Sequence, residues 1–182
     1  MKTIETANIA AELPGLVARG RSPEIPEAMD IYGWLVGSWE FDVRQYWVDV
    51  SARGLKGEVN FAWVLEGRAV QDTWIMPARA ERHGEPDKNC NMYGTTLRVW
   101  DSTLQAWRVT WFNPVTGARC ELVGRWSGKD IVQTGALPNG APIRWMFTEI
   151  EPDSFRWTGE TLQPDGATWK LEGDFRARRV PQ

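Results

Sequence analysis

The feature that most constrains the fold is an alternation of polar and apolar residues that begins at Gly37 and continues almost to the C-terminus. Short runs in which every second residue is β-branched or aromatic are separated by turn-forming residues at nearly regular spacing. This pattern is typical of an all-β sandwich or barrel. We predict about ten antiparallel strands, at 38–48, 56–65, 68–76, 92–100, 106–112, 118–126, 130–136, 142–150, 154–163 and 167–177.

The connections between these strands favour an up-and-down meander. Most are hairpin-sized, as at Glu66-Gly67, Ser127-Gly128 and Pro164-Asp165-Gly166, and such residues form tight turns. Residues 77–91 are the exception, because this stretch is polar and interrupted by Pro and Gly, so we expect a long loop at one mouth of a barrel. No useful helix-period segment follows Gly37, which excludes βαβ folds. The predicted class is an antiparallel up-and-down barrel of roughly eight to ten strands.

Residues 1–36 differ from the rest and form a separate N-terminal segment, packed on a barrel of residues 37–182. Pro26, followed by Glu27 and Ala28, is suited to open a short helix that runs to Leu35. We therefore predict a helical plug over one end of the barrel, with a disordered tail at residues 1–12 as the alternative. An earlier amphipathic helix is indicated by apolar residues at Ile4, Ile9, Leu13, Leu16 and Val17.

The composition argues against nucleic acids and membranes as partners. The net charge is −3, and Lys and Arg are spread along the 182 residues, so no basic footprint for nucleic acid is present. No window is apolar enough to span a membrane, and the N-terminus lacks the apolar core of a secretory signal, which favours a cytoplasmic location. The chain has 12 Trp and only 3 Tyr. Trp rings suit both cavity walls and ordinary core filling.

The two cysteines, Cys90 and Cys120, have no CxxC spacing and no partner His at ligand spacing. Neither a disulfide framework nor a metal site is therefore expected. In a reducing compartment both thiols would be free. No phosphate-binding or dinucleotide glycine motif is present either, so no cofactor is predicted.

The last three predicted strands indicate which side chains face the interior. Pairing Ile150 with Phe155 and Leu162 with Thr168 lines up opposite charges on one face. The other face is then mostly apolar, and we assign it to the cavity. Arg144 is suited to bind a carboxylate there, unless it reaches solvent at the barrel end. The candidate ligand-binding residues on this face are Arg144, Met146, Thr148, Trp157, Trp169 and Leu171.

A second group of candidates comes from the middle of the chain. If Trp100 faces Trp107 across the 101–106 turn, then Arg98 and Trp111 share a face. The sequence does not decide whether that face lies inside. Catalytic residues stay unknown, because the acids that are possible in principle show no partner within reach: Glu40, Asp42, Asp72 and Glu160.

Several strings carry a family resemblance. Gly37-Ser38-Trp39-Glu40 resembles the opening signature of lipocalin-like (calycin) barrels, in which the Trp closes the barrel base. The strings 93–117, 130–135 and 143–160 are similar to an uncharacterised bacterial family of such barrels, and the similarity runs over about residues 32–178. The resemblance implies the fold and the binding of a ligand inside it, but it implies no enzymatic activity. Haem-binding relatives use a His as axial ligand, and His83, in the polar 77–91 loop, is the only His of this chain, so haem is not expected.

Three functions follow as hypotheses. The leading one is a protein that binds a small, mostly apolar molecule, aromatic or carboxylated, inside the barrel. The alternative is a cofactor-free cyclase, isomerase or lyase, because such chemistry needs only shape and one or two polar groups. The third is a self-associating structural protein, a homodimer for example, that uses Trp145 and Phe147 as an outward apolar face.

Overall fold

The computed structural model describes residues 15–82 and 90–181, and all ten predicted strands are present in it. A two-residue strand, β2, and several single 3-10 turns are added between them. The strands are β1 (Gly37–Tyr46), β2 (Val48–Asp49), β3 (Lys56–Val64), β4 (Ala69–Met76), β5 (Met92–Asp101), β6 (Ala106–Asn113), β7 (Ala118–Ser127), β8 (Asp130–Ala136), β9 (Pro142–Glu151), β10 (Ser154–Leu162) and β11 (Trp169–Arg179).

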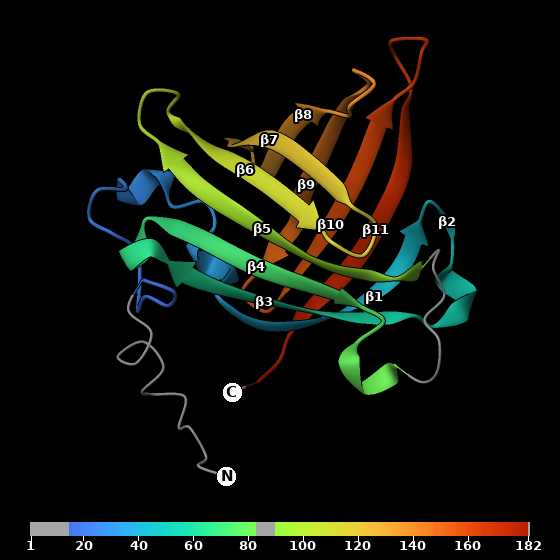
Figure 1. Ribbon diagram of the computed structural model, residues 1–182, viewed down its shortest axis with the longest axis horizontal. Coiled ribbons are helices and arrows are strands. Elements are labelled where there is room, and N and C mark those ends of the chain that lie inside the picture. The colour runs from blue at the N-terminus through green and yellow to red at the C-terminus, as the bar shows by residue number, and fades with distance from the viewer. Residues whose placement is uncertain (1–14, 83–89, 182) are drawn as a thin grey trace.

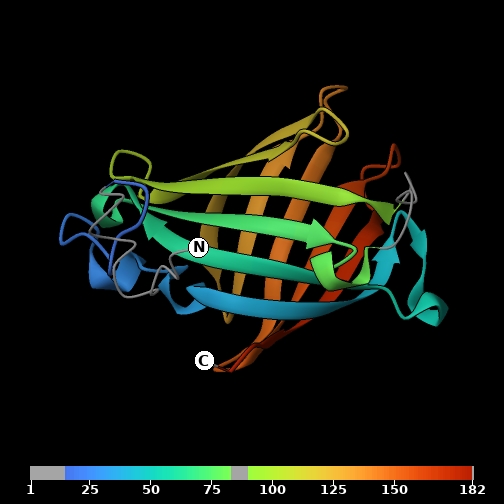
Figure 2. The same ribbon diagram turned by 60° about the horizontal axis from the view of Figure 1, so that its bottom comes forward.

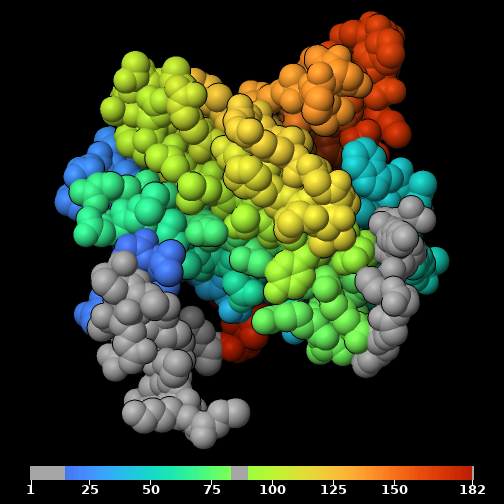
Figure 3. All heavy atoms as spheres, viewed as in Figure 1, coloured from blue at the N-terminus to red at the C-terminus, as the bar shows by residue number. Residues whose placement is uncertain are grey.

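The ten long strands form a closed antiparallel barrel (Figures 1 and 2). Neighbours in sequence are neighbours in the sheet, and β11 pairs with β1 to complete the ring. The predicted all-β, up-and-down class is therefore confirmed. In the space-filling view the β5–β6 and β10–β11 turns stand out from the barrel with a hollow between them (Figure 3).

The interior follows the period-two pattern of each strand. In β1 the alternate residues Trp39, Phe41 and Val43 are buried, and in β3 so are the alternate residues Gly57, Val59, Phe61 and Trp63. These side chains join one continuous core with those of the other strands. Because β-branched and aromatic residues occupy alternate positions, burying them on one face of the sheet favours its closure into a barrel.

The predicted helical plug is wrong as a helix, although the segment does cover one end of the barrel. Residues 15–36 contain a β-bridge from Ala18 to Trp63 and two 3-10 turns, η2 (Glu27–Met29) and η3 (Gly33–Leu35). No α-helix occurs within residues 15–82 and 90–181. The earlier predicted helix falls mostly on residues 1–14, outside the described ranges.

Contacts with the barrel hold the N-terminal segment in place. Indole N–H groups from two strands donate to its carbonyls: Trp39 to Leu35 at 2.7 Å and Trp107 to Met29 at 2.8 Å. Tyr32 and Leu35 are fully buried. These two bonds anchor the segment to β1 and β6. The segment lies at the left end of the barrel in Figure 1, opposite β2 and the β6–β7 turn.

The register of the β5–β6 hairpin is as predicted: Trp100 lies opposite Trp107 and Arg98 opposite Val109. The predicted register of β9 with β10 is wrong by one residue. Thr148 faces Arg156, and an extra residue in β9 forms a bulge at Glu149, whose φ is 51°. The shift exchanges the two faces of β9, so Trp145 and Phe147 point inward. The proposed outward dimer face on these two residues is therefore wrong.

A second bulge interrupts the pairing of β10 with β11. Gly159 faces Gly173 but Glu160 faces Leu171, which leaves Glu172 as the extra residue. For residues 169–171 of β11, the bulge exchanges the inward and outward faces relative to the prediction. The predicted register would place Arg156 opposite Asp174 and Glu160 opposite Lys170, but Arg156 faces Arg176 and Glu160 faces Leu171. Arg156 still reaches Asp174 diagonally and forms an ion pair with it at 2.8 Å.

The predicted long loop after β4 is seen in part. It contains the turn η6 (Arg79–Glu81), while two further turns, η4 (Ser51–Arg53) and η5 (Leu65–Gly67), lie before and after β3. His83 lies outside the described ranges. Within those ranges no helix is long and apolar enough to cross a membrane.

Candidate functional site: an aromatic cavity in the open end of the barrel

A cavity of about 340 Å³ lies inside the barrel, toward the end opposite the N-terminal segment. Its volume is near the lower limit of ordinary ligand pockets, which span roughly 300–1,000 Å³. The wall is mostly aromatic. The lining residues are Tyr46, Trp47, Trp74, Met92, Thr96, Arg98, Trp111, Asn113, Thr116, Ala118, Cys120, Trp145, Trp157, Gly159, Glu172, Gly173 and Phe175.

The rings of the wall support one another. Trp157 stacks on Phe175 with ring centres 4.9 Å apart and meets Trp145 edge-on at 5.7 Å. Trp145 in turn meets Trp111 at 6.3 Å, and Trp74 lies 5.9 Å from Trp157. Such pairs add about 0.5–1.5 kcal/mol each beyond the area they bury. The wall is therefore a preformed aromatic surface.

Glycines make room for these rings. Gly159 and Gly173 face each other on β10 and β11, and a Cβ built on either would approach the Trp157 ring to 2.9 or 2.8 Å. A Cβ on Gly94 would overlap the Trp111 ring. These glycines permit the close approach of a ring to the backbone, which no other residue type allows.

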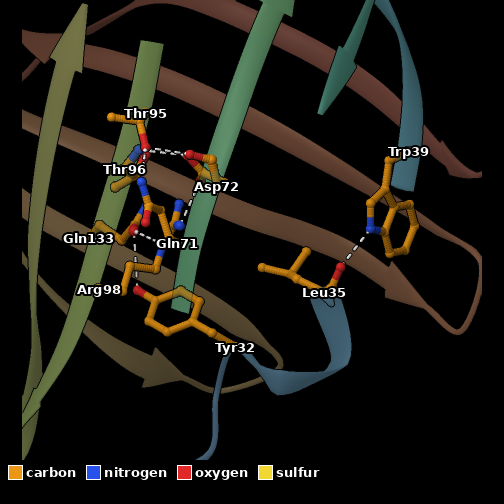
Figure 4. Close-up of polar contacts among 9 residues, drawn as sticks. All are labelled: Tyr32, Leu35, Trp39, Gln71, Asp72, Thr95, Thr96, Arg98 and Gln133. Atoms are coloured by element: carbon orange, nitrogen blue, oxygen red, sulfur yellow. Dashed lines mark hydrogen bonds and ion pairs between the residues drawn. The ribbon is translucent and has the colours of Figure 1, made fainter. Parts of the chain in front are cut away.

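Arg98, which lines the cavity and is called its floor below, forms a buried ion pair with Asp72 (Figure 4). Arg98 Nη1 donates to Asp72 Oδ2 at 2.6 Å, and the two side chains are 2% and 0% exposed. The other Asp72 oxygen accepts the backbone N–H of Thr96 at 2.6 Å. The guanidinium also lies over the Tyr32 ring, 5.0 Å from its centre. The positive charge at the floor is therefore neutralised by the protein itself.

Behind the floor, the network reaches the N-terminal segment. Gln133 Oε1 accepts from the Tyr32 hydroxyl at 3.1 Å and from Arg98 Nε at 3.4 Å. Burial is the largest cause of a strong upward shift in the pKa of Tyr32, so this phenol stays neutral and donates. Gln133 Nε2 is buried without a hydrogen-bond partner among the described residues. The network ties the plug end to the cavity floor.

Glu172 brings a carboxylate into the cavity wall. It is the extra residue of the β11 bulge, and bulges redirect side chains in this way near functional sites. Its Oε2 accepts the Thr161 hydroxyl at 2.7 Å. Its Oε1 lies 3.9 Å from Lys170 Nζ, at the limit of an ion pair.

The rim is formed in part by Tyr46 and Trp47, where β1 turns into β2. Trp47 has φ 62°, is 54% exposed, and donates its backbone N–H to the Glu172 carbonyl at 2.6 Å. Burial raises the pKa of the Tyr46 hydroxyl, and burial likewise raises the pKa of the Cys120 thiol. Both groups are therefore protonated at neutral pH.

Three of the eight predicted site residues line the cavity: Arg98, Trp111 and Trp157. The other five are not part of its wall, because the two bulges reverse the strand faces on which they lie. Arg144 pairs with Glu160 and lies over the Trp169 ring at 4.1 Å, on the outer face. Those five residues are Arg144, Met146, Thr148, Trp169 and Leu171.

Sequence reasoning missed Trp74, Trp145 and Glu172. Trp74 could have been found, because it alternates with the buried residues Val70 and Asp72 in β4. Trp145 and Glu172 depend on bulges, for which the alternation gives no signal. Of the candidate acids, Asp72 holds Arg98 and Glu160 holds Arg144. No group of three or more potential metal ligands occurs within residues 15–82 and 90–181.

Fold and cavity together define a lipocalin-like barrel with an aromatic pocket. One solved structure similar to this chain is the S-type phycobiliprotein lyase CpeS from Guillardia theta, with a TM-score of 0.53 and 12% sequence identity. The similarity covers 85% of this chain and 93% of that one. At this identity the likeness concerns the fold. Neither the family models nor the curated proteins that were compared match the sequence.

Proposed function

We propose that this protein binds a small, mostly apolar, aromatic molecule in the barrel cavity. The observation that carries the proposal is the aromatic wall around a volume of about 340 Å³. A barrel that needed only a packed core would fill this space with side chains, because protein interiors are packed about as densely as organic crystals. A hollow lined by preformed rings and a few polar groups is the usual form of a ligand pocket.

The polar groups of the cavity favour binding over catalysis. Tyr46 and Cys120 are held protonated by burial, so neither serves as a general base or a thiolate nucleophile at neutral pH. Arg98 is engaged by Asp72. The similar barrel is named a phycobiliprotein lyase, which keeps the cofactor-free enzyme as the second candidate. A reaction on this fold would have to rely on Glu172, the remaining ionisable side chain among the described lining residues.

The first test measures binding of N-phenyl-1-naphthylamine, an uncharged aromatic probe that fluoresces in apolar surroundings. We expect saturable binding of one probe per chain. Ala118→Trp should weaken it at least about tenfold, because Ala118 lines the cavity and an indole there would occupy the space.

The matched control is Thr103→Trp, which adds the same ring on the exposed β5–β6 turn, away from the cavity. It should bind the probe as the unmodified chain does. Absence of saturable binding, or equal loss in both variants, would contradict the proposed function.

A further inference from the structure

The charged side chains that line the cavity differ in how fully the protein itself neutralises them. Two charged residues, Arg98 and Glu172, are among the described lining residues. The Arg98 guanidinium is bound to the Asp72 carboxylate at 2.6 Å, and both are withdrawn from water. Such a pair presents no net charge to a ligand. An anionic ligand would therefore have to compete with Asp72 for the guanidinium, at the cost of leaving a buried carboxylate unpaired.

Glu172 is in the opposite situation. One carboxylate oxygen accepts the Thr161 hydroxyl, while within residues 15–82 and 90–181 the other has only the 3.9 Å contact with Lys170. Lys170 is 52% exposed, so solvent screens this contact and it contributes little. The negative charge of the cavity is therefore available to a ligand.

Aromatic residues lie next to Glu172 and Gly173 in the sheet. Trp47 is bonded through its backbone to Glu172, and Tyr46 faces Gly173, the next residue of β11. Trp157 lies against Gly173 from the other side. All three residues line the same cavity as Glu172. Ring faces attract cations, and the attraction is strongest where water is excluded.

From this arrangement we infer that the ligand of the cavity carries a cationic group, a protonated or quaternary amine, that binds against Glu172 between the rings of Tyr46, Trp47 and Trp157. The inference rests on the proposed function and specifies its ligand class. It also replaces the carboxylated ligand considered from the sequence, because Arg98 already has a carboxylate partner.

The experiment compares three probes that share one ring system: 2-naphthylmethyl-trimethylammonium, 2-naphthylmethanol and 2-naphthylacetate. Dissociation constants are measured by isothermal titration calorimetry at fixed ionic strength. We expect the cation to bind at least about tenfold tighter than the alcohol, in line with a desolvated cation–π and charge interaction. The acetate should bind most weakly.

The decisive variant is Glu172→Gln, which keeps the shape and removes the charge. It should bring the affinity for the cation to within about twofold of that for the alcohol, while the affinity for the alcohol stays unchanged. The control is Glu160→Gln, which removes a charge on the neighbouring strand but on the outer face. It should preserve the order of the three probes, which separates a local effect from a change in net charge.

A third variant keeps the test valid if Glu172→Gln fails to fold. Thr161→Val removes the hydroxyl that orients Glu172 and should lower the preference for the cation without changing alcohol binding. Equal affinities for the three probes in the unmodified chain, or a preference for the cation that survives both Glu172→Gln and Thr161→Val, would overturn the inference but leave the binding function standing. If N-phenyl-1-naphthylamine and all three naphthyl probes fail to bind, the proposed function itself fails.

Discussion

The guanidinium of Arg98 and the carboxylate of Asp72 stabilise the barrel only as a pair. Each charge is withdrawn from water and is satisfied by the other and by neighbouring polar groups. Removing one partner leaves an uncompensated buried charge, whereas replacing both with apolar groups of similar volume is often neutral. The pair therefore adds little net stability, but a substitution of one partner is tolerated only when the other partner is replaced as well.

This reasoning gives a prediction for urea unfolding. Asp72→Ala should lower the free energy of unfolding by about 3–5 kcal/mol, because Arg98 is left buried and unpaired. Combining it with Arg98→Met should recover much of the loss. Glu121→Ala, which breaks an exposed ion pair with Arg119, should change stability by less than about 1 kcal/mol. Equal losses from Asp72→Ala and Glu121→Ala would contradict the account of the floor.

At the scale of single elements, the strands were predictable and their faces only in part. Alternation located all ten long strands because each is half-buried. The β5–β6 pairing was also predictable, since Trp100 and Trp107 flank a short turn, and it correctly grouped Arg98 with Trp111. The bulges at Glu149 and Glu172 were not predictable, because an added residue leaves the local alternation intact while reversing the face beyond it. Trp157 pairs with Phe175 on one side of the β11 bulge and points inward, whereas Trp169 lies on the other side of the bulge and does not.

The close packing of the Trp111 ring on Gly94 gives a prediction for strand β5. Gly94→Ala should destabilise the protein by about 1–3 kcal/mol, because the added methyl overlaps Trp111 and forces a repacking of the wall. In a Trp111→Leu background the same change should cost less, because only the close approach to the Phe112 carbonyl oxygen then remains. Gly20→Ala, whose added methyl meets nothing within 4 Å, serves as the control, with thermal unfolding as the measurement. If Gly94→Ala is as harmless as Gly20→Ala, the ring does not lie where the structure places it.

At the scale of the whole molecule, the barrel has two unlike ends. One is sealed by residues 15–36 through the indole bonds of Trp39 and Trp107. The other is open around the aromatic cavity. The ion pair of Arg98 and Asp72 separates them, and its hydrogen bonds connect through Gln133 to Tyr32 at the sealed end. The resemblance of the Gly-x-Trp segment correctly predicted a Trp at the sealed base, although residues 15–36, which cover it, contain no α-helix.

The two cysteines differ in their access to the cavity. Cys120 lines the cavity, while Cys90 is buried and is contacted by Arg53 at 3.1 Å. We expect iodoacetamide to modify Cys120 faster than Cys90, since Cys90 is reached only when the structure opens locally. Because burial raises the pKa of Cys120, its labelling should be slow at neutral pH and should accelerate as the pH rises.

Peptide mapping by mass spectrometry measures the labelling of both sites in one sample. A saturating cavity probe, N-phenyl-1-naphthylamine, should protect Cys120. The rate at Cys90 is the internal control and should not change. Faster modification of Cys90, or no protection of Cys120 by a probe that binds, would show that Cys120 does not face the binding site.

The bulge at Glu172 has a consequence for how such a barrel changes through descent. A single inserted or deleted codon in β11 would alter which side chains meet the ligand, yet it would leave the order and closure of the ten strands as they are. Two relatives with the same architecture can therefore bind chemically different ligands even when their aligned sequences differ by a single gap in this strand. Comparisons that score substitutions alone would pass over that difference.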